Sequence, residues 1–70
     1  MKMSIQMTIE LDDKYVETWN ERSVSYYTLL YKSEELGLQA LEENPITKAI
    51  ADEIEDYVEN MHGVTKCEIL

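Results

Sequence analysis

Several residue types that commonly stabilise or equip small domains are scarce in this chain. It contains one cysteine, one histidine, one proline, two glycines and no phenylalanine. The single cysteine, Cys67, excludes an intramolecular disulfide, and His62 and Cys67 together supply too few ligands for a zinc site of the usual kind. Gly37 and Gly63 are too far apart to form a phosphate-binding loop. The sequence therefore predicts neither a metal nor a cofactor.

Long apolar runs are also missing. No stretch approaches the ~18 apolar residues of a membrane-spanning helix. Lys2 is followed by alternating polar and apolar residues, not by the continuous apolar stretch of a signal peptide. Together with the free thiol, these features predict a cytoplasmic protein without membrane contact.

The length of 70 residues predicts one domain, 1–70, with a small core. A chain of this size buries only about 60% of the surface that its unfolded form exposes. Small domains compensate with disulfides, metals or self-association. Because the first two are excluded, we expect a homodimer.

Charge is abundant, of one sign, and unevenly placed. The formal net charge is −9. Residues 1–32 carry four basic and five acidic side chains, a net charge of −1, whereas residues 33–70 carry two basic and ten acidic ones, a net charge of −8. The second half is expected to repel nucleic acid and attract basic surfaces, although the charge also serves solubility.

The clearest local pattern lies at the N-terminus. The apolar residues Met3, Ile5, Met7, Ile9 and Leu11 alternate with polar ones. A period of two places the apolar set on one face of a strand. We therefore expect a strand with its odd-numbered residues buried on a core.

Residues 12–23 permit two interpretations. Asp12 and Asp13 can cap a helix, and residues 14–19 fit either a short helix, with Trp19 on its apolar side, or a strand rich in Tyr, Val and Trp. Residues 20–23 read as a turn.

Residues 24–31 are ambiguous between helix and strand. Their composition favours a strand, but their apolar positions continue into a helical stripe that reaches Leu41. We favour a helix over about 24–43, bent or broken near 33–37.

The last third predicts a helix followed by a strand. Asn44 can cap a helix with Pro45 in its first turn, and Gly63 is suited to end it. An apolar face follows the helical period, and residues 64–70 then alternate like a strand. The apolar face consists of Ile46, Ile50, Ile54, Tyr57, Val58 and Met61. The predicted fold class is α+β: N-terminal and C-terminal strands, with two to three helices between them packed on one sheet face.

No arrangement of residues indicates an enzyme. Cys67 falls at an inward position of the predicted strand, where a free cysteine acts as a small apolar residue. His62 lies near a helix C-terminus, where it suits the helix dipole. We therefore predict a non-enzymatic protein.

Acidic residues on the last helix form the candidate site. At about 100° per residue, they share the side opposite the isoleucines. Glu42 and Glu43, at the end of the preceding helix, extend the negatively charged surface. Trp19 is a candidate aromatic anchor because tryptophan is enriched at interface centres. The predicted partner-binding residues are Asp52, Glu55, Asp56, Glu59, Glu42, Glu43 and Trp19. The expected partner is a protein with a basic surface, not nucleic acid itself.

The first part of the chain resembles the ribbon-helix-helix regulators. The resemblance covers roughly residues 2–31: a strand with an outward polar row, then Leu11-Asp12-Asp13, a helix, a turn and a second helix. It implies that two N-terminal strands pair across a dimer and that their polar face enters the DNA major groove, with Lys2, Ser4 and Gln6 reading bases. Two features differ from the family: the first predicted helix is short, and the chain has no basic excess.

Three functional hypotheses follow, the third being a small structural subunit whose charge serves only solubility. The first is an acidic binding protein that sequesters or inhibits a partner, by occupying a surface that otherwise binds nucleic acid. The alternative is a dimeric, ribbon-helix-helix-like DNA-binding regulator.

Overall fold

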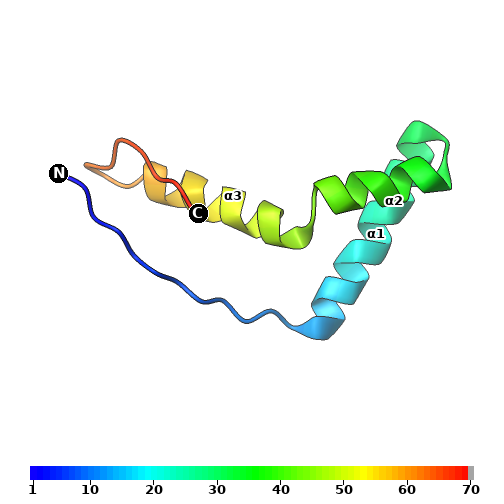
Figure 1. Ribbon diagram of the computed structural model, residues 1–70, viewed down its shortest axis with the longest axis horizontal. Coiled ribbons are helices and arrows are strands. Elements are labelled where there is room, and N and C mark those ends of the chain that lie inside the picture. Colours follow the sequence, from blue (N-terminus) through cyan, green and yellow to red (C-terminus); the bar gives the residue numbers. More distant parts are fainter. Residues whose placement is uncertain (70) are drawn as a thin grey trace.

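The computed structural model describes residues 1–69, which form three helices joined by short turns (Figure 1). Helix α1 spans Asp13–Tyr31, α2 spans Glu34–Glu43 and α3 spans Ile46–Glu59. Residues 1–12 are extended, and the last described residues return along α3. No strand occurs within residues 1–69, so the predicted α+β fold is wrong and the protein is all-helical.

The two terminal strands fail for the same physical reason. A strand needs a neighbour for its backbone N–H and C=O groups, and alternation indicates which side is apolar without supplying that neighbour. Residues 3–11 are extended, but Met3 and Ile5 are 77% and 73% exposed instead of buried. Residues 64–69 form no ladder, because the amides of Cys67 and Ile69 donate to side chains of α3.

Helix α1 is longer than predicted. It continues through residues 20–23, where we expected a turn, and includes residues 14–19, where a strand was the alternative. No glycine or proline interrupts this stretch, and Asp13 places a negative charge in the first turn, where the helix dipole favours it. The ambiguous residues 24–31 are therefore the end of α1.

The break between α1 and α2 lies at Lys32 and Ser33, at the start of the predicted region. Lys32 adopts a left-handed conformation with φ 55°, and its N–H donates to the carbonyl oxygen of Thr28. The Ser33 hydroxyl then accepts a hydrogen bond from the N–H of Leu36 at 3.3 Å, which caps α2.

Helices α1 and α2 cross closely at Gly37. A Cβ atom at this position would lie 3.0 Å from the backbone nitrogen of Thr28 and would also meet the Thr28 hydroxyl. Gly37 is buried, as is Ala40 one turn later. Small residues on this side of α2 therefore allow the two backbones to approach.

The boundary between α2 and α3 lies one residue later than predicted, because Asn44 does not cap α3. Asn44 ends α2: its backbone N–H and its side-chain amide both donate to the carbonyl of Ala40. Pro45 precedes the first residue of α3. The helix ends at Glu59, and Gly63 adopts the expected left-handed conformation, φ 88°, in the turn beyond it.

The molecule is open and elongated. Its dimensions are 47 × 24 × 18 Å. Helix α2 packs on α1, whereas α3 leaves this pair and touches α1 only near its own first turn (Figure 1). Among the described residues, the buried apolar side chains are Ala40 and Ile46 alone. The core is therefore small even for a chain of this length.

Candidate functional site: the acidic face of α3

Helix α3 has its apolar and acidic residues on opposite sides. Ile46 is buried, and Ile50, Ile54 and Val58 are half-buried. The apolar stripe is thus confirmed along most of its length, although Tyr57 and Met61 are exposed. Among the acids, Asp52 and Asp56 are exposed and lie one turn apart. They form the freely accessible part of the candidate site.

Glu55 and Glu59 have a different role from the neighbouring aspartates. The Glu59 carboxylate accepts a hydrogen bond from the N–H of Cys67 at 3.0 Å, and the Glu55 carboxylate accepts one from the N–H of Ile69 at 2.7 Å. Residues one helical turn apart are separated by about 6 Å along the axis, and alternate residues of an extended chain by about 6.6 Å. The distance between the Glu55 and Glu59 carboxylates is therefore close to the distance between the N–H groups of alternate residues in an extended segment.

The returning segment was not recognised as part of the site from the sequence. Its alternation from Val64 onward predicted a closing sheet strand, which is wrong because no sheet forms within residues 1–69. The missing information is that its N–H groups meet carboxylates and not carbonyl groups. The candidate face is consequently half occupied by the chain's own end.

The acidic residues of α3 form no ion pair within residues 1–69, although Lys66 lies near enough to Glu59 to be attracted by it. Within residues 1–69 the only ion pair joins the Lys66 ammonium to the Glu68 carboxylate at 2.7 Å. Hydrogen bonding and attraction within this exposed pair raise the pKa of Lys66 and lower the pKa of Glu68. Asp52 and Asp56 have no such ion pair, so their negative charge is exposed to solvent.

The other predicted site residues lie apart from this face. Glu42 and Glu43 are exposed at the end of α2, on the other side of the turn at residues 44–45. They continue the acidic surface along the chain but belong to a different helix. Trp19 does not lie on the acidic face at all.

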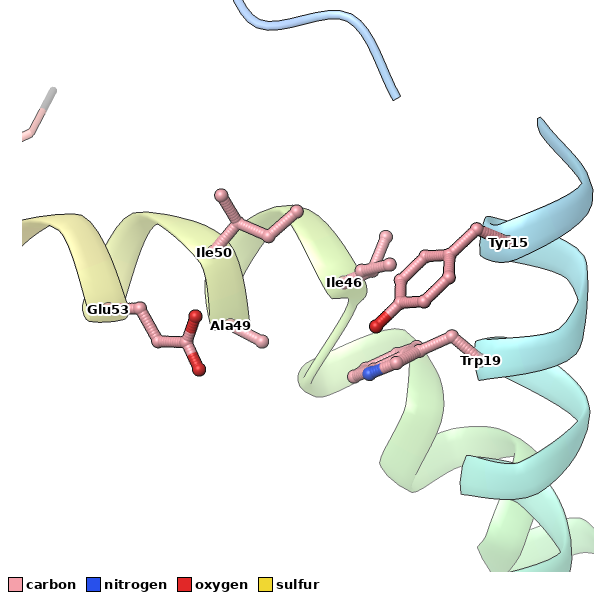
Figure 2. Close-up of a pocket in the computed structure, with 6 residues that line it drawn as sticks. All are labelled: Tyr15, Trp19, Ile46, Ala49, Ile50 and Glu53. Atoms are coloured by element: carbon pink, nitrogen blue, oxygen red, sulfur yellow. The ribbon is translucent and has the colours of Figure 1, made fainter. Parts of the chain in front are cut away.

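Trp19 lies where α1 meets α3. Figure 2 shows Trp19 and Tyr15 of α1 pointing toward Ile46 of α3, with the Glu53 carboxylate on the far side of the hollow. The hollow has a volume of about 90 Å³, whereas sites for small molecules usually measure ~300–1,000 Å³. Trp19 therefore contributes to the junction between the two helices, away from the acidic face, and its role as a partner-binding aromatic anchor stays a prediction.

Aromatic side chains also follow the outside of α1. Tyr27 makes an edge-to-face contact with Tyr26 at a ring-centre distance of 5.4 Å and stacks on Tyr31 at 6.1 Å. Tyr26 and Tyr31 are exposed, as is Leu29 between them. The sequence left open whether these rings fill a core or form an interface; in the single chain they lie largely on the surface.

Two further observations bear on the kind of site. No cluster of three histidine, cysteine, aspartate or glutamate side chains within residues 1–69 is arranged to hold a metal ion. In the same range, no helix is long and apolar enough to cross a membrane.

Comparison with protein-family models, curated proteins and solved structures gives no match to this chain.

Proposed function

We propose that this chain is a small, acidic, non-enzymatic binding protein that sequesters or inhibits a protein with a basic surface. The observation that carries the proposal is the α3 face: Asp52 and Asp56 are exposed on the side opposite the apolar stripe and form no ion pair within residues 1–69, although Lys48 lies one turn before Asp52. Such a surface attracts basic partners at long range and favours fast association.

The spacing of these acids supports a specific mode of inhibition. Aspartates one turn apart present charges about 6 Å apart, which is comparable with the phosphates of a nucleic-acid strand. A helix with this surface can occupy a groove lined with lysine and arginine. Glu42 and Glu43 extend the charged surface toward α2.

The chain's own end shapes how a partner approaches. Glu55 and Glu59 are engaged by residues 67 and 69, so the first contact falls to Asp52 and Asp56. Because the two glutamates accept backbone N–H groups, an extended segment of a partner that replaces residues 64–69 would find the same acceptors.

The test is a charge reversal with a matched control. Proteins retained from a lysate of the source cells at low and high salt are identified, and the affinity of the purified partner is measured. Asp52→Lys with Asp56→Lys should weaken binding at least tenfold and leave the helical circular dichroism unchanged. Binding by the wild type should also fall with salt, since the Debye length shortens from ~10 Å at 0.1 M to ~3 Å at 1 M.

The control is Glu17→Lys with Glu21→Lys. These residues are exposed on α1, and their reversal changes the net charge by the same amount. If both double variants lose affinity equally, overall charge and not the α3 face governs binding, and the proposal fails.

A ribbon-helix-helix-like DNA-binding regulator is the second candidate. It is favoured by an extended segment followed by two helices, but residues 2–31 contain only α1, of 19 residues, where the resemblance placed two helices and a turn, and the second helix is α2. Lys2, Ser4 and Gln6 are exposed. Sequence-specific binding of duplex DNA by the wild type, lost in Gln6→Ala but kept in the α3 reversals, would establish this function instead.

A further inference from the structure

The end of the described chain binds back onto α3. Beyond the helix the chain reverses in a short turn, and residues 64–69, the returning segment, run back along α3 (Figure 1). The N–H of Cys67 donates to the Glu59 carboxylate at 3.0 Å. The N–H of Ile69 donates to the Glu55 carboxylate at 2.7 Å. The returning segment is thus antiparallel to α3 and is held by two backbone donors.

The returning segment is attached to the helix but not buried. Val64 and Cys67 are half-buried, and its other residues are exposed. Both hydrogen bonds to α3 lie at the surface. Segments with few buried contacts and exposed hydrogen bonds open locally while the rest of a protein stays folded. The returning segment can therefore leave α3 without unfolding the three helices.

Glu55 and Glu59 recognise the backbone of the returning segment and not its side chains. Both donors are main-chain N–H groups, which every residue except proline supplies. Within residues 1–69, no side chain of the segment forms a hydrogen bond or an ion pair with α3. An extended segment of another protein therefore offers the same donors at the same spacing.

We propose that the returning segment is an autoinhibitory competitor, which covers Glu55 and Glu59 until an extended, basic segment of a partner displaces it. This inference rests on the proposed function, because it concerns the same face of α3. Asp52 and Asp56 stay exposed and attract the basic segment first. Release of residues 64–69 then adds two carboxylates to the contact, so that four acids on one side of the helix become available.

The charges of the returning segment explain why a basic chain can replace it. Lys66 is its only basic residue, and the Lys66 ammonium pairs with the Glu68 carboxylate at 2.7 Å. Glu59 also attracts Lys66 and helps to raise its pKa, but Glu68 contributes more. Residues 64–69 therefore carry no net charge. A partner segment with lysine or arginine and no acid brings uncompensated positive charge, which all the α3 acids attract.

Attachment to the same chain gives the returning segment an advantage of its own. A tethered competitor has an effective concentration on the order of millimolar, whatever the concentration of the free partner. A neutral extended chain therefore competes poorly with it, whereas a strongly basic chain gains enough attraction to replace it. The returning segment thus makes the α3 face selective for basic segments.

The experiment measures binding of a short synthetic peptide of alternating lysine and threonine to the full chain by titration calorimetry. Cys67→Pro with Ile69→Pro removes both N–H donors and leaves the α3 acids in place. The apparent affinity of a site is reduced by the fraction of molecules in which it is open, so this variant should bind the peptide roughly tenfold more tightly than the wild type.

Thr65→Pro with Cys67→Ser is the matched control. It introduces proline into the same segment and removes the same thiol, but it keeps the N–H groups of residues 67 and 69. The Thr65 N–H donates no hydrogen bond within residues 1–69, so the control should bind the peptide like the wild type. A peptide with the same side chains but methylated backbone nitrogens has no N–H donors, so it should bind the double-proline variant and the wild type equally.

Equal or weaker binding of the unmodified peptide by the double-proline variant overturns the autoinhibition, and a gain that persists with the methylated peptide overturns the role of backbone donors. These failures differ from failure of the proposed function. If Asp52→Lys with Asp56→Lys abolishes peptide binding but the prolines change nothing, the proposed function stands and the autoinhibition alone is wrong. If the peptide binds neither the wild type nor the double-proline variant, both are wrong.

Discussion

Residues 1–32 and residues 33–69 deal with apolar surface in opposite ways. The first group is nearly neutral, with a net charge of −1, and buries none of its side chains. The second carries most of the charge, yet it contains the buried residues Gly37, Ala40 and Ile46. The half with little charge thus exposes most of the large apolar side chains, and the half with much charge contains the few buried residues.

The contrast also separates the two kinds of interaction by their response to salt. Burial of the exposed apolar side chains of residues 1–32 would rest on the hydrophobic effect, which salts such as sulfate strengthen. Association of α3 with a basic partner rests on attraction, so added salt weakens it.

The largest effect is expected from charges placed in the apolar row. If the apolar residues from Met3 to Leu11 form the contact surface of the expected homodimer, Ile5→Asp and Ile9→Asp bury an unpaired carboxylate there, and such burial ranks among the most destabilising changes, above about 4 kcal/mol. Both variants should become monomeric and melt at lower temperature. Thr8→Asp, on the polar side, should remain dimeric.

This comparison can fail in an informative way. In an isolated chain, Ile5 is 73% exposed and Ile9 is 47% exposed, so aspartate at either position would do little harm there. Equal melting temperatures for all three variants would show that the N-terminal half has no interface.

A moderate effect is expected at the contact that joins the two halves. Gly37→Ala introduces a methyl group 3.0 Å from the Thr28 backbone nitrogen, and overpacking of this kind costs about 1–3 kcal/mol. The helix propensity of alanine offsets roughly 1 kcal/mol of that. Urea unfolding should still show a net loss of stability.

Ala40→Gly serves as the comparison for this variant. It makes the opposite change on the same side of α2 and loses propensity without adding a clash. If Gly37→Ala were instead more stable than the wild type, the close approach of α1 and α2 would be excluded.

The smallest effect is expected at the end of the chain. Glu59→Gln weakens a charge-assisted hydrogen bond to the exposed Cys67 amide. We expect faster hydrogen exchange at the amides of residues 67 and 69, with a change of less than about 1 kcal/mol in overall stability. Asp56→Gln, one turn away and without such a bond, should leave both amides unchanged.

The pH dependence of this segment has a definite sign. The pKa of Glu68 is lowered by Lys66, so its ion pair helps to hold the segment above the carboxyl's unperturbed pKa and is lost as the pH falls through the lowered value. The pKa of Lys66 is raised, and the same pair is lost again as the pH rises through that raised value. Both groups are fully exposed, so the effect on global unfolding is expected to be negligible.

The sequence by itself determined the local properties of this protein. Alternation in residues 3–11 predicted a strand buried on one face, and this prediction is wrong because no sheet forms within residues 1–69. The helical period over residues 46–58 correctly predicted α3, and Gly63 correctly indicated a left-handed turn. These features depend on neighbouring residues, whose geometry is set by backbone periods and by steric limits at single positions.

Only the tertiary structure decided what each local feature contacts. Periodicity could not show that the N-terminal and C-terminal segments do not pair with each other. It also could not show that Glu55 and Glu59 accept hydrogen bonds from the backbone amides of residues 69 and 67, or that Trp19 lies at the α1–α3 junction. The fold class was predicted wrongly because alternation marks an apolar side without saying what covers it. The residues that bury an apolar side are distant in sequence or belong to another molecule, and only tertiary or quaternary packing brings them close.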